Sequence, residues 1–65
     1  MYAKYSARAI VRHLRTFGFS DGMIAKAIGA SRVTIYRIHN GLQSGSQYVE
    51  DLNTLLRLSK THTDN

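Results

Sequence analysis

Apolar residues in the first quarter of the chain recur every three or four positions, and polar residues fill the positions between them. This spacing places the apolar side chains on one stripe of a helix. The stripe contains Ala3, Ala7, Ile10, Val11, Leu14 and Phe17. The pattern predicts a helix that begins near residue 3 or residue 6 and ends at Thr16, with Gly18 as its left-handed stop.

Two shorter helical segments follow, and each lies between a serine and a glycine. Ser20 can accept an N–H bond from the first turn of a helix over residues 21–28, which Gly29 ends. Phe19 and Ile24 are spaced to pack together across that helix start. The residues expected to face inward are Ile24, Ala25 and Ile28.

The next segment repeats this plan. Ser31 is the expected N-cap of a helix that runs to about Asn40, with Ile35 and Ile38 facing inward and Gly41 as the stop.

The last segment predicts a loop over residues 42–46 and a helix over about 46–60. Ser44 or Ser46 is the expected N-cap, and Gln47 would complete a capping box with Ser44. This helix has more apolar residues than a single buried stripe requires. They are Tyr48, Val49, Leu52, Leu55, Leu56 and Leu58.

The polar residues 61–65 are expected to fray. No alternation of apolar and polar residues is long enough for a strand. We therefore expect an all-α fold, a small bundle of four to five helices that forms a single domain over residues 1–65.

The composition argues against metal and catalytic sites. Cysteine is absent, and His13, His39 and His62 have no helical partner histidine four residues away, so we expect no metal and no cofactor. No pair of acidic residues accompanies a histidine in a credible catalytic arrangement, so we expect no enzyme. The acidic residues are Asp21, Glu50, Asp51 and Asp64.

The charge is divided unevenly along the chain. Residues 1–41 carry seven basic residues against one acidic residue, whereas residues 42–65 carry two against three. A basic front half suits a polyanionic partner, although solubilising charge is the plainer explanation. No apolar run approaches the roughly 18 residues of a membrane span, and residues 1–5 do not resemble the core of a signal peptide. We therefore expect a cytoplasmic protein, in a bacterial cytoplasm or nucleoid, with no membrane partner.

The most informative stretch is residues 21–40. Two short helices that cross steeply need a small residue at the crossing, which Ala25 provides, and a residue that tolerates positive φ in the turn, which Gly29 provides. Apolar residues must fix both helices to the core, and Ile24, Ile28, Ala30, Ile35 and Ile38 have the required spacing. A plain helical hairpin in another bundle is the alternative.

This stretch resembles the helix-turn-helix of the phage Cro and repressor family, also called Xre-like. The resemblance covers roughly residues 6–60, and it includes the ending at Ile38–Gly41 and the leucine-rich helix that follows. It implies a lambda-repressor-like fold in which helix 31–40 enters the major groove of double-stranded DNA. Asp21 departs from the family, which often has a neutral residue there, and it is expected to turn away from phosphate.

The resemblance gives the exposed residues of the motif their roles. Ser31, Arg32, Val33 and Tyr36 are the expected base-reading residues; Arg32 matches the acceptors of guanine, and Val33 suits a thymine methyl group. The expected phosphate-binding residues are Ser20, Gly22, Thr34, Arg37, Asn40, Gln43 and Ser44. The plainer alternatives are a phosphate contact for Arg32, a lone exposed valine for Val33 and a partly buried core tyrosine for Tyr36.

The arginines of the first helix leave two interpretations open. Arg8, Arg12 and Arg15 either widen the basic footprint or form a solvated helix face. The second is the commoner arrangement. His13 and His39 are expected to be surface or hydrogen-bonded histidines.

The surplus apolar residues of the last helix suggest a homodimer, because two half-sites one helical turn apart specify DNA better than one. The expected interface contains Tyr48, Val49, Leu52, Leu55 and Leu56, and Leu58 belongs to the same apolar set. The alternative is that these leucines complete the core of a monomer.

The function that follows is a sequence-specific transcriptional regulator of the repressor type, which binds a palindromic operator and no small-molecule ligand. One alternative is a DNA-binding component of a recombination or excision system, since Thr34–Arg37 also resembles the recognition helix of resolvase-type recombinases. Another is a protein–protein module, such as an antitoxin or an inhibitor, that uses the last helix.

Overall fold

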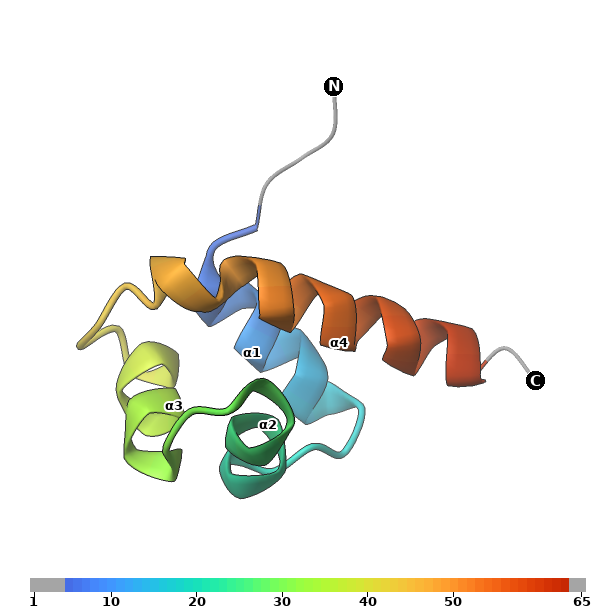
Figure 1. The fold of residues 1–65 in the computed structure, drawn as a ribbon, viewed down its shortest axis with the longest axis horizontal. Coiled ribbons are helices and arrows are strands. Elements are labelled where there is room, and N and C mark those ends of the chain that lie inside the picture. The colour runs from blue at the N-terminus through green and yellow to red at the C-terminus, as the bar shows by residue number, and fades with distance from the viewer. Residues whose placement is uncertain (1–4, 64–65) are drawn as a thin grey trace.

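The computed structural model describes residues 5–63, and their side chains as far as Ser59. These residues form four α-helices and one short 3-10 helix, and they contain no strand (Figure 1). The elements are α1 (Ala7–Thr16), α2 (Asp21–Ile28), α3 (Arg32–His39), η1 (Ser46–Tyr48) and α4 (Val49–Thr63). The expected all-α class is confirmed.

Serine hydroxyl groups begin the first three helices. In each case the oxygen accepts a hydrogen bond from the backbone N–H three residues ahead, which satisfies a donor that the helix itself cannot use. The bonds are Ala9 N–H to Ser6 (3.2 Å), Met23 N–H to Ser20 (3.2 Å) and Thr34 N–H to Ser31 (3.1 Å). The predicted caps Ser20 and Ser31 are confirmed, and α1 starts at the later of its two expected positions.

The turn between α2 and α3 depends on Gly29. Its φ of 75° and ψ of 27° are left-handed, a conformation that costs other residues energy, and its N–H donates to the carbonyl of Ala25. The N–H of Ala30 donates to the same carbonyl at 2.9 Å. The chain therefore leaves α2 and enters α3 within three residues.

The start of the last helix differs from the prediction. Gly45 is the N-cap of η1, and no side chain caps that helix, so the capping box of Ser44 with Gln47 is wrong. Ser44 instead accepts a bond from the N–H of Ser46 at 3.4 Å. Residues 61–63 belong to α4, which corrects their expected fraying, and residues 64–65 lie outside the described part.

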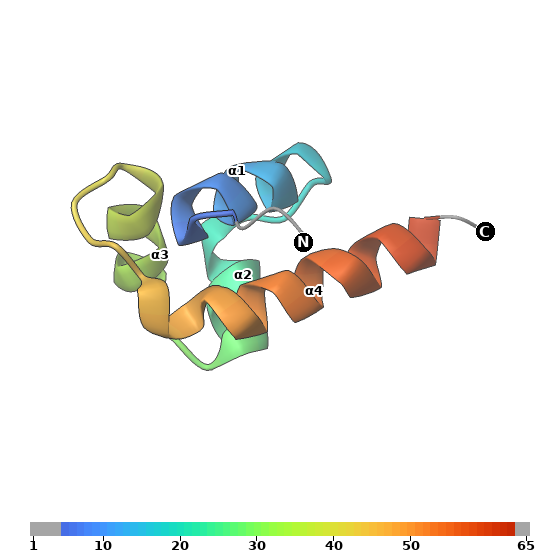
Figure 2. The same ribbon diagram turned by 90° about the horizontal axis from the view of Figure 1, so that it is seen from above.

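The hydrophobic core lies where the four α-helices meet. α1 packs against α3 and α4, and α2 packs against α3 (Figures 1 and 2). The buried residues are Ala7, Ile10, Val11, Leu14, Ile24, Ala25, Ile35, Ile38, Leu52 and Leu56. The inward orientation predicted within residues 21–40 is confirmed, although Ile28 is only half-buried. Phe17 is 43% exposed because it follows the last turn of α1, and Ala3 lies outside the described residues.

Candidate nucleic-acid interface

Helix α3 has two sharply different faces. Ile35 and Ile38 have no exposed surface and anchor the helix to the core. The opposite face is exposed along its whole length and continues into the C-cap; it contains Arg32, Val33, Tyr36, Arg37 and Asn40. We call these five residues the α3 outer face. No acidic residue lies in α3, so this face carries positive charge from its two arginines.

The α3 outer face is unusually apolar between its arginines. Val33 is 57% exposed and Tyr36 is 55% exposed. Tyr36 is therefore not a partly buried core tyrosine, whereas the exposure of Val33 fits both of its interpretations. A helix that displays branched apolar, aromatic and guanidinium groups together carries the groups that contact thymine methyls and the acceptor edge of guanine.

Arg32 lies against the start of α2. A Cβ atom built on Gly22 would be 3.7 Å from Cδ of Arg32 and 4.0 Å from Oγ of Ser20. The aliphatic stem of Arg32 therefore passes over the first turn of α2. The structure brings together one expected base-reading residue and two expected phosphate-binding residues, although they belong to different helices.

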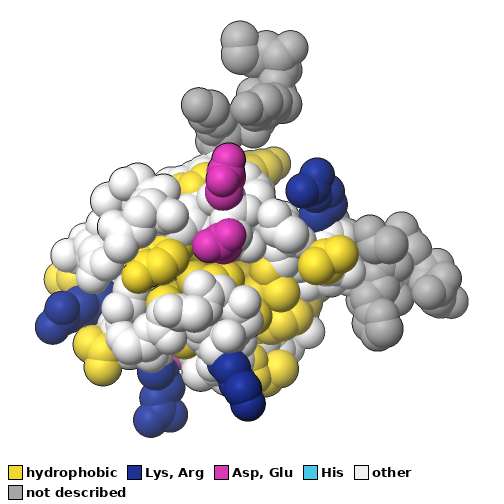
Figure 3. Space-filling model, in the orientation of Figure 1, with side chains coloured by type: hydrophobic (Ala, Val, Ile, Leu, Met, Phe, Trp, Pro, Cys, Tyr) yellow, Lys and Arg dark blue, Asp and Glu magenta, His cyan; other side chains and the backbone are white. Residues whose placement is uncertain are grey.

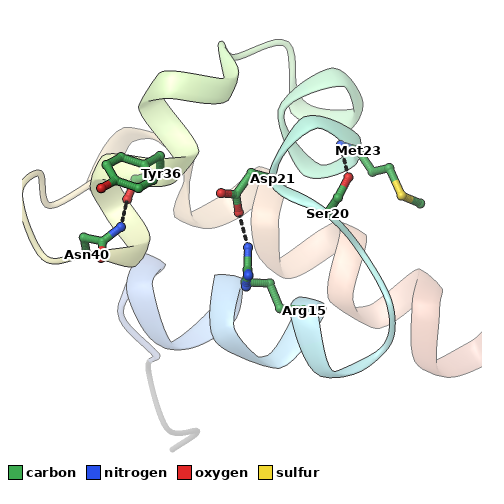
Figure 4. A network of polar contacts seen from close by, with 6 residues as sticks. All are labelled: Arg15, Ser20, Asp21, Met23, Tyr36 and Asn40. Carbon is green, nitrogen blue, oxygen red and sulfur yellow. Dashed lines mark hydrogen bonds and ion pairs between the residues drawn. The ribbon is translucent and has the colours of Figure 1, made fainter.

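Several polar side chains predicted to touch DNA already hold the helix ends. The hydroxyl groups of Ser31 and Thr34 are 2.9 Å apart, and that of Ser31 also caps α3. Nδ2 of Asn40 donates to the carbonyl of Tyr36 at 2.8 Å, so the amide is fixed beside the tyrosine (Figure 4). Ser31 thus supports the α3 outer face structurally, while Arg32, Val33 and Tyr36 are exposed side chains of that face.

The remaining expected phosphate ligands flank α3 on both sides. Ser20 caps α2, and its exposed side chain lies next to Met23, which points away from Tyr36 (Figure 4). Gln43 is half-buried and Ser44 is exposed, both in the loop after α3. Donors are therefore available at the two ends of the α3 outer face.

Asp21 is directed toward α1. Its Oδ1 lies 2.6 Å from Nη1 of Arg15, and its side chain is 19% exposed (Figure 4). The expectation that this carboxylate turns away from phosphate stays a prediction, and the ion pair with Arg15 accounts for the direction it takes. Arg15 is still 41% exposed, but its charge is paired with a carboxylate of the same chain. Such a partly exposed pair adds at most about 1 kcal/mol to stability.

Arg8 makes a contact that sequence reasoning missed. Its Nε donates to the backbone carbonyl of His39 at 3.1 Å, across 31 positions of sequence. Nη1 of the same guanidinium is 3.6 Å from the place where a Cβ on Gly41 would be. No local sequence pattern predicts this contact, which holds an exposed arginine against the end of α3. His13 has a different neighbour, the ring of Tyr5, at a centroid distance of 6.1 Å.

Helix α4 divides its apolar residues between the core and the surface. Leu52 has no exposed surface and Leu56 only 6%, so these two cannot form a partner interface as expected. Tyr48, Val49 and Leu55 are half-buried and pack against the core. Leu58 is 62% exposed. The periodicity predicted the helix correctly, but it could not separate the core leucines from the exposed one.

A shallow apolar groove lies between the end of α2 and the middle of α4. It encloses about 300 Å³ and is lined by Ala27, Ile28, Asp51, Thr54, Leu55 and Leu58. We call it the α2–α4 groove. Figure 3 shows a band of apolar side chains on this face, with acidic side chains next to it.

No group of three or more histidine, cysteine or acidic residues within the described part of the chain could hold a metal ion. None of the helices formed by residues 5–63 has the length and apolar character needed to cross a membrane. Comparisons with protein-family models, with curated proteins and with solved structures find no match to this chain.

Proposed function

We propose that this protein binds double-stranded DNA sequence-specifically through the α3 outer face and acts as a transcriptional repressor similar to the phage Cro and repressor family. The observation that carries this proposal is the composition of that face. Arg32, Val33, Tyr36 and Arg37 project from a helix whose opposite side is locked into the core by Ile35 and Ile38. A rigid helix with basic and apolar groups on one exposed side fits the major groove.

The residues divide by position into base readers and phosphate ligands. Arg32 and Val33 lie in the first turn of α3, which enters the groove most deeply in this family, and Tyr36 follows one turn later. Arg37 and Asn40 lie toward the end of the helix, where a phosphate is nearer than a base. Ser20, Gly22, Thr34, Gln43 and Ser44 supply further backbone contacts around the helix.

We infer that the functional unit is a homodimer that uses the α2–α4 groove. A two-fold interface must be complementary to itself, so a projection and a hollow must occur on the same surface. Leu58 projects beside the groove that it helps to line.

Selection of binding sites from random DNA tests the proposal most directly. The expected result is a palindromic consensus whose half-sites are about one helical turn, roughly 34 Å, apart. A consensus without symmetry would contradict the dimer and leave sequence-specific binding in place. Absence of any affinity for DNA at low salt would overturn the proposed function and favour a protein–protein module.

A further inference from the structure

The three arginines of α1 have different environments. Arg15 is paired with Asp21 at 2.6 Å. Arg12 is exposed, and no hydrogen bond or ion pair joins it to the described part of the chain. Arg8 is held against the end of α3 by the carbonyl of His39. Charge alone could not distinguish these residues, whereas their contacts give each one a different capacity to bind an anion.

The guanidinium of Arg8 is fixed, but it is not neutralised. Only Nε is used by the bond to His39, which leaves the N–H groups on the two η nitrogens. Among the described residues no carboxylate lies within ion-pair distance of Arg8, and Asp21 pairs with Arg15 instead. The negative end of the α3 dipole also favours a cation at this place.

This fixed position lies beside the loop that follows α3. The guanidinium is 3.6–3.8 Å from the position of a Cβ on Gly41, so it lies close over the backbone where the loop begins. Gln43 and Ser44, which carry amide and hydroxyl donors, follow within three residues. The charged fork thus lies where the loop that carries these neutral donors begins, at the end of α3 opposite Arg32.

We propose that Arg8 and the loop over residues 41–44 form a phosphate-binding site for the DNA backbone, outside the helix-turn-helix motif. A guanidinium already held in place loses less conformational freedom when it binds, and its two η nitrogens match two phosphate oxygens. This inference rests on the proposed DNA-binding function. It adds a second anchor at the C-terminal end of α3, so the helix is held on the phosphate backbone at both ends.

The salt dependence of binding tests this site. Removing one phosphate-binding charge lowers the slope of log K against log salt concentration by about 0.9. We expect Arg8→Gln, which keeps a donor for the carbonyl of His39 but removes the charge, to show this change on operator and on random DNA alike. Between about 50 and about 200 mM salt the affinity of the variant should fall about threefold less than that of the wild type.

Arg12→Gln is the matched control, because Arg12 is an exposed arginine on the same helix that contacts neither α3 nor a carboxylate of the described chain. An unchanged slope for this control supports the site. A wild-type slope for Arg8→Gln with weaker binding to operator alone would overturn it, since Arg8 would then only position α3. Arg8→Lys keeps the charge and should keep the slope. Wild-type protein that binds no DNA would instead refute the proposed function itself.

Discussion

The backbone of Gly45 lies directly on the side chain of Ile38. A Cβ atom on Gly45 would be 2.5 Å from Cδ1 and 2.7 Å from Cγ1 of Ile38, and 3.1 Å from Cβ of Ala7. The φ of 65° at Gly45 adds a second reason for glycine. The loop before α4 is thereby fixed to α1 and to the buried side of α3.

We therefore expect Gly45→Ala to lower the free energy of unfolding by about 2–4 kcal/mol, because the added methyl group meets a packed core and the backbone is strained. Urea unfolding followed by circular dichroism measures the decrease. Gly22→Ala is the control, since its Cβ meets only ordinary contacts at 3.7–4.0 Å and the residue is helical. A Gly45→Ala variant as stable as Gly22→Ala would contradict the close approach.

The two arginines of the α3 outer face should respond differently to truncation. Arg32→Ala is expected to relax sequence preference by about 1–3 kcal/mol at one base pair, because alanine cannot make the bidentate hydrogen bonds to guanine. Arg37→Ala should weaken operator and random DNA equally and reduce the salt dependence. Binding titrations on both DNAs separate these effects. Equal weakening on both DNAs for Arg32→Ala would show that Arg32 holds a phosphate and reads no base.

Leu58→Asp should abolish the homodimer and leave the fold intact, since this side chain is 62% exposed in the monomer. Sedimentation equilibrium measures the change in mass, and operator affinity should fall with it. Leu42→Asp is the control for the mass measurement alone, because Leu42 is 70% exposed and lies outside the α2–α4 groove, but it belongs to the loop proposed to bind phosphate. Dimers of unchanged stability in Leu58→Asp would place the interface elsewhere.

Two substitutions of Ser31 should distinguish its role as a helix cap from a contact with DNA. Ser31→Ala removes the cap of α3 and is expected to cost about 1 kcal/mol in stability, with a further effect on Thr34, its hydroxyl partner. Ser31→Asp restores a cap but introduces a negative charge at the start of the recognition helix. Its thermal stability should stay near that of the wild type while DNA affinity falls. Wild-type affinity in Ser31→Asp would show that this end of α3 is remote from phosphate.

α2, α3 and the turn between them could be predicted from sequence because their signals are local. Ser20 and Ser31 cap helices whose stops follow within ten residues, and Gly29 satisfies a backbone requirement that needs no distant partner. The start of the last helix could not be predicted in the same way. Gly45 is required by the approach of Ile38 and Ala7, and the side chain of Ala7 belongs to a helix far away in the sequence.

The difference between local and long-range signals also explains which features of the surface could be predicted from sequence. The spacing of Ile35 and Ile38 predicted correctly that the rest of α3 faces outward. α4 contains too many leucines for their spacing to show which of them are buried. Long side chains are harder still, because Arg8 reaches a carbonyl 31 positions away and nothing near it in the sequence indicates that partner.

The pairing of Arg15 with Asp21 has a kinetic consequence. Asp21 is the one acidic residue among residues 1–41, and its carboxylate is tied to a cation and largely covered. We expect a polyanion that approaches the α3 outer face to meet mainly positive charge, because the one carboxylate of residues 5–41 is paired with Arg15. Positive charge on this face speeds the diffusional encounter with a polyanion. This acceleration falls steeply as ionic strength rises. One short ion pair between two helices thus affects how fast a ligand arrives, although it adds little to how firmly the chain is folded.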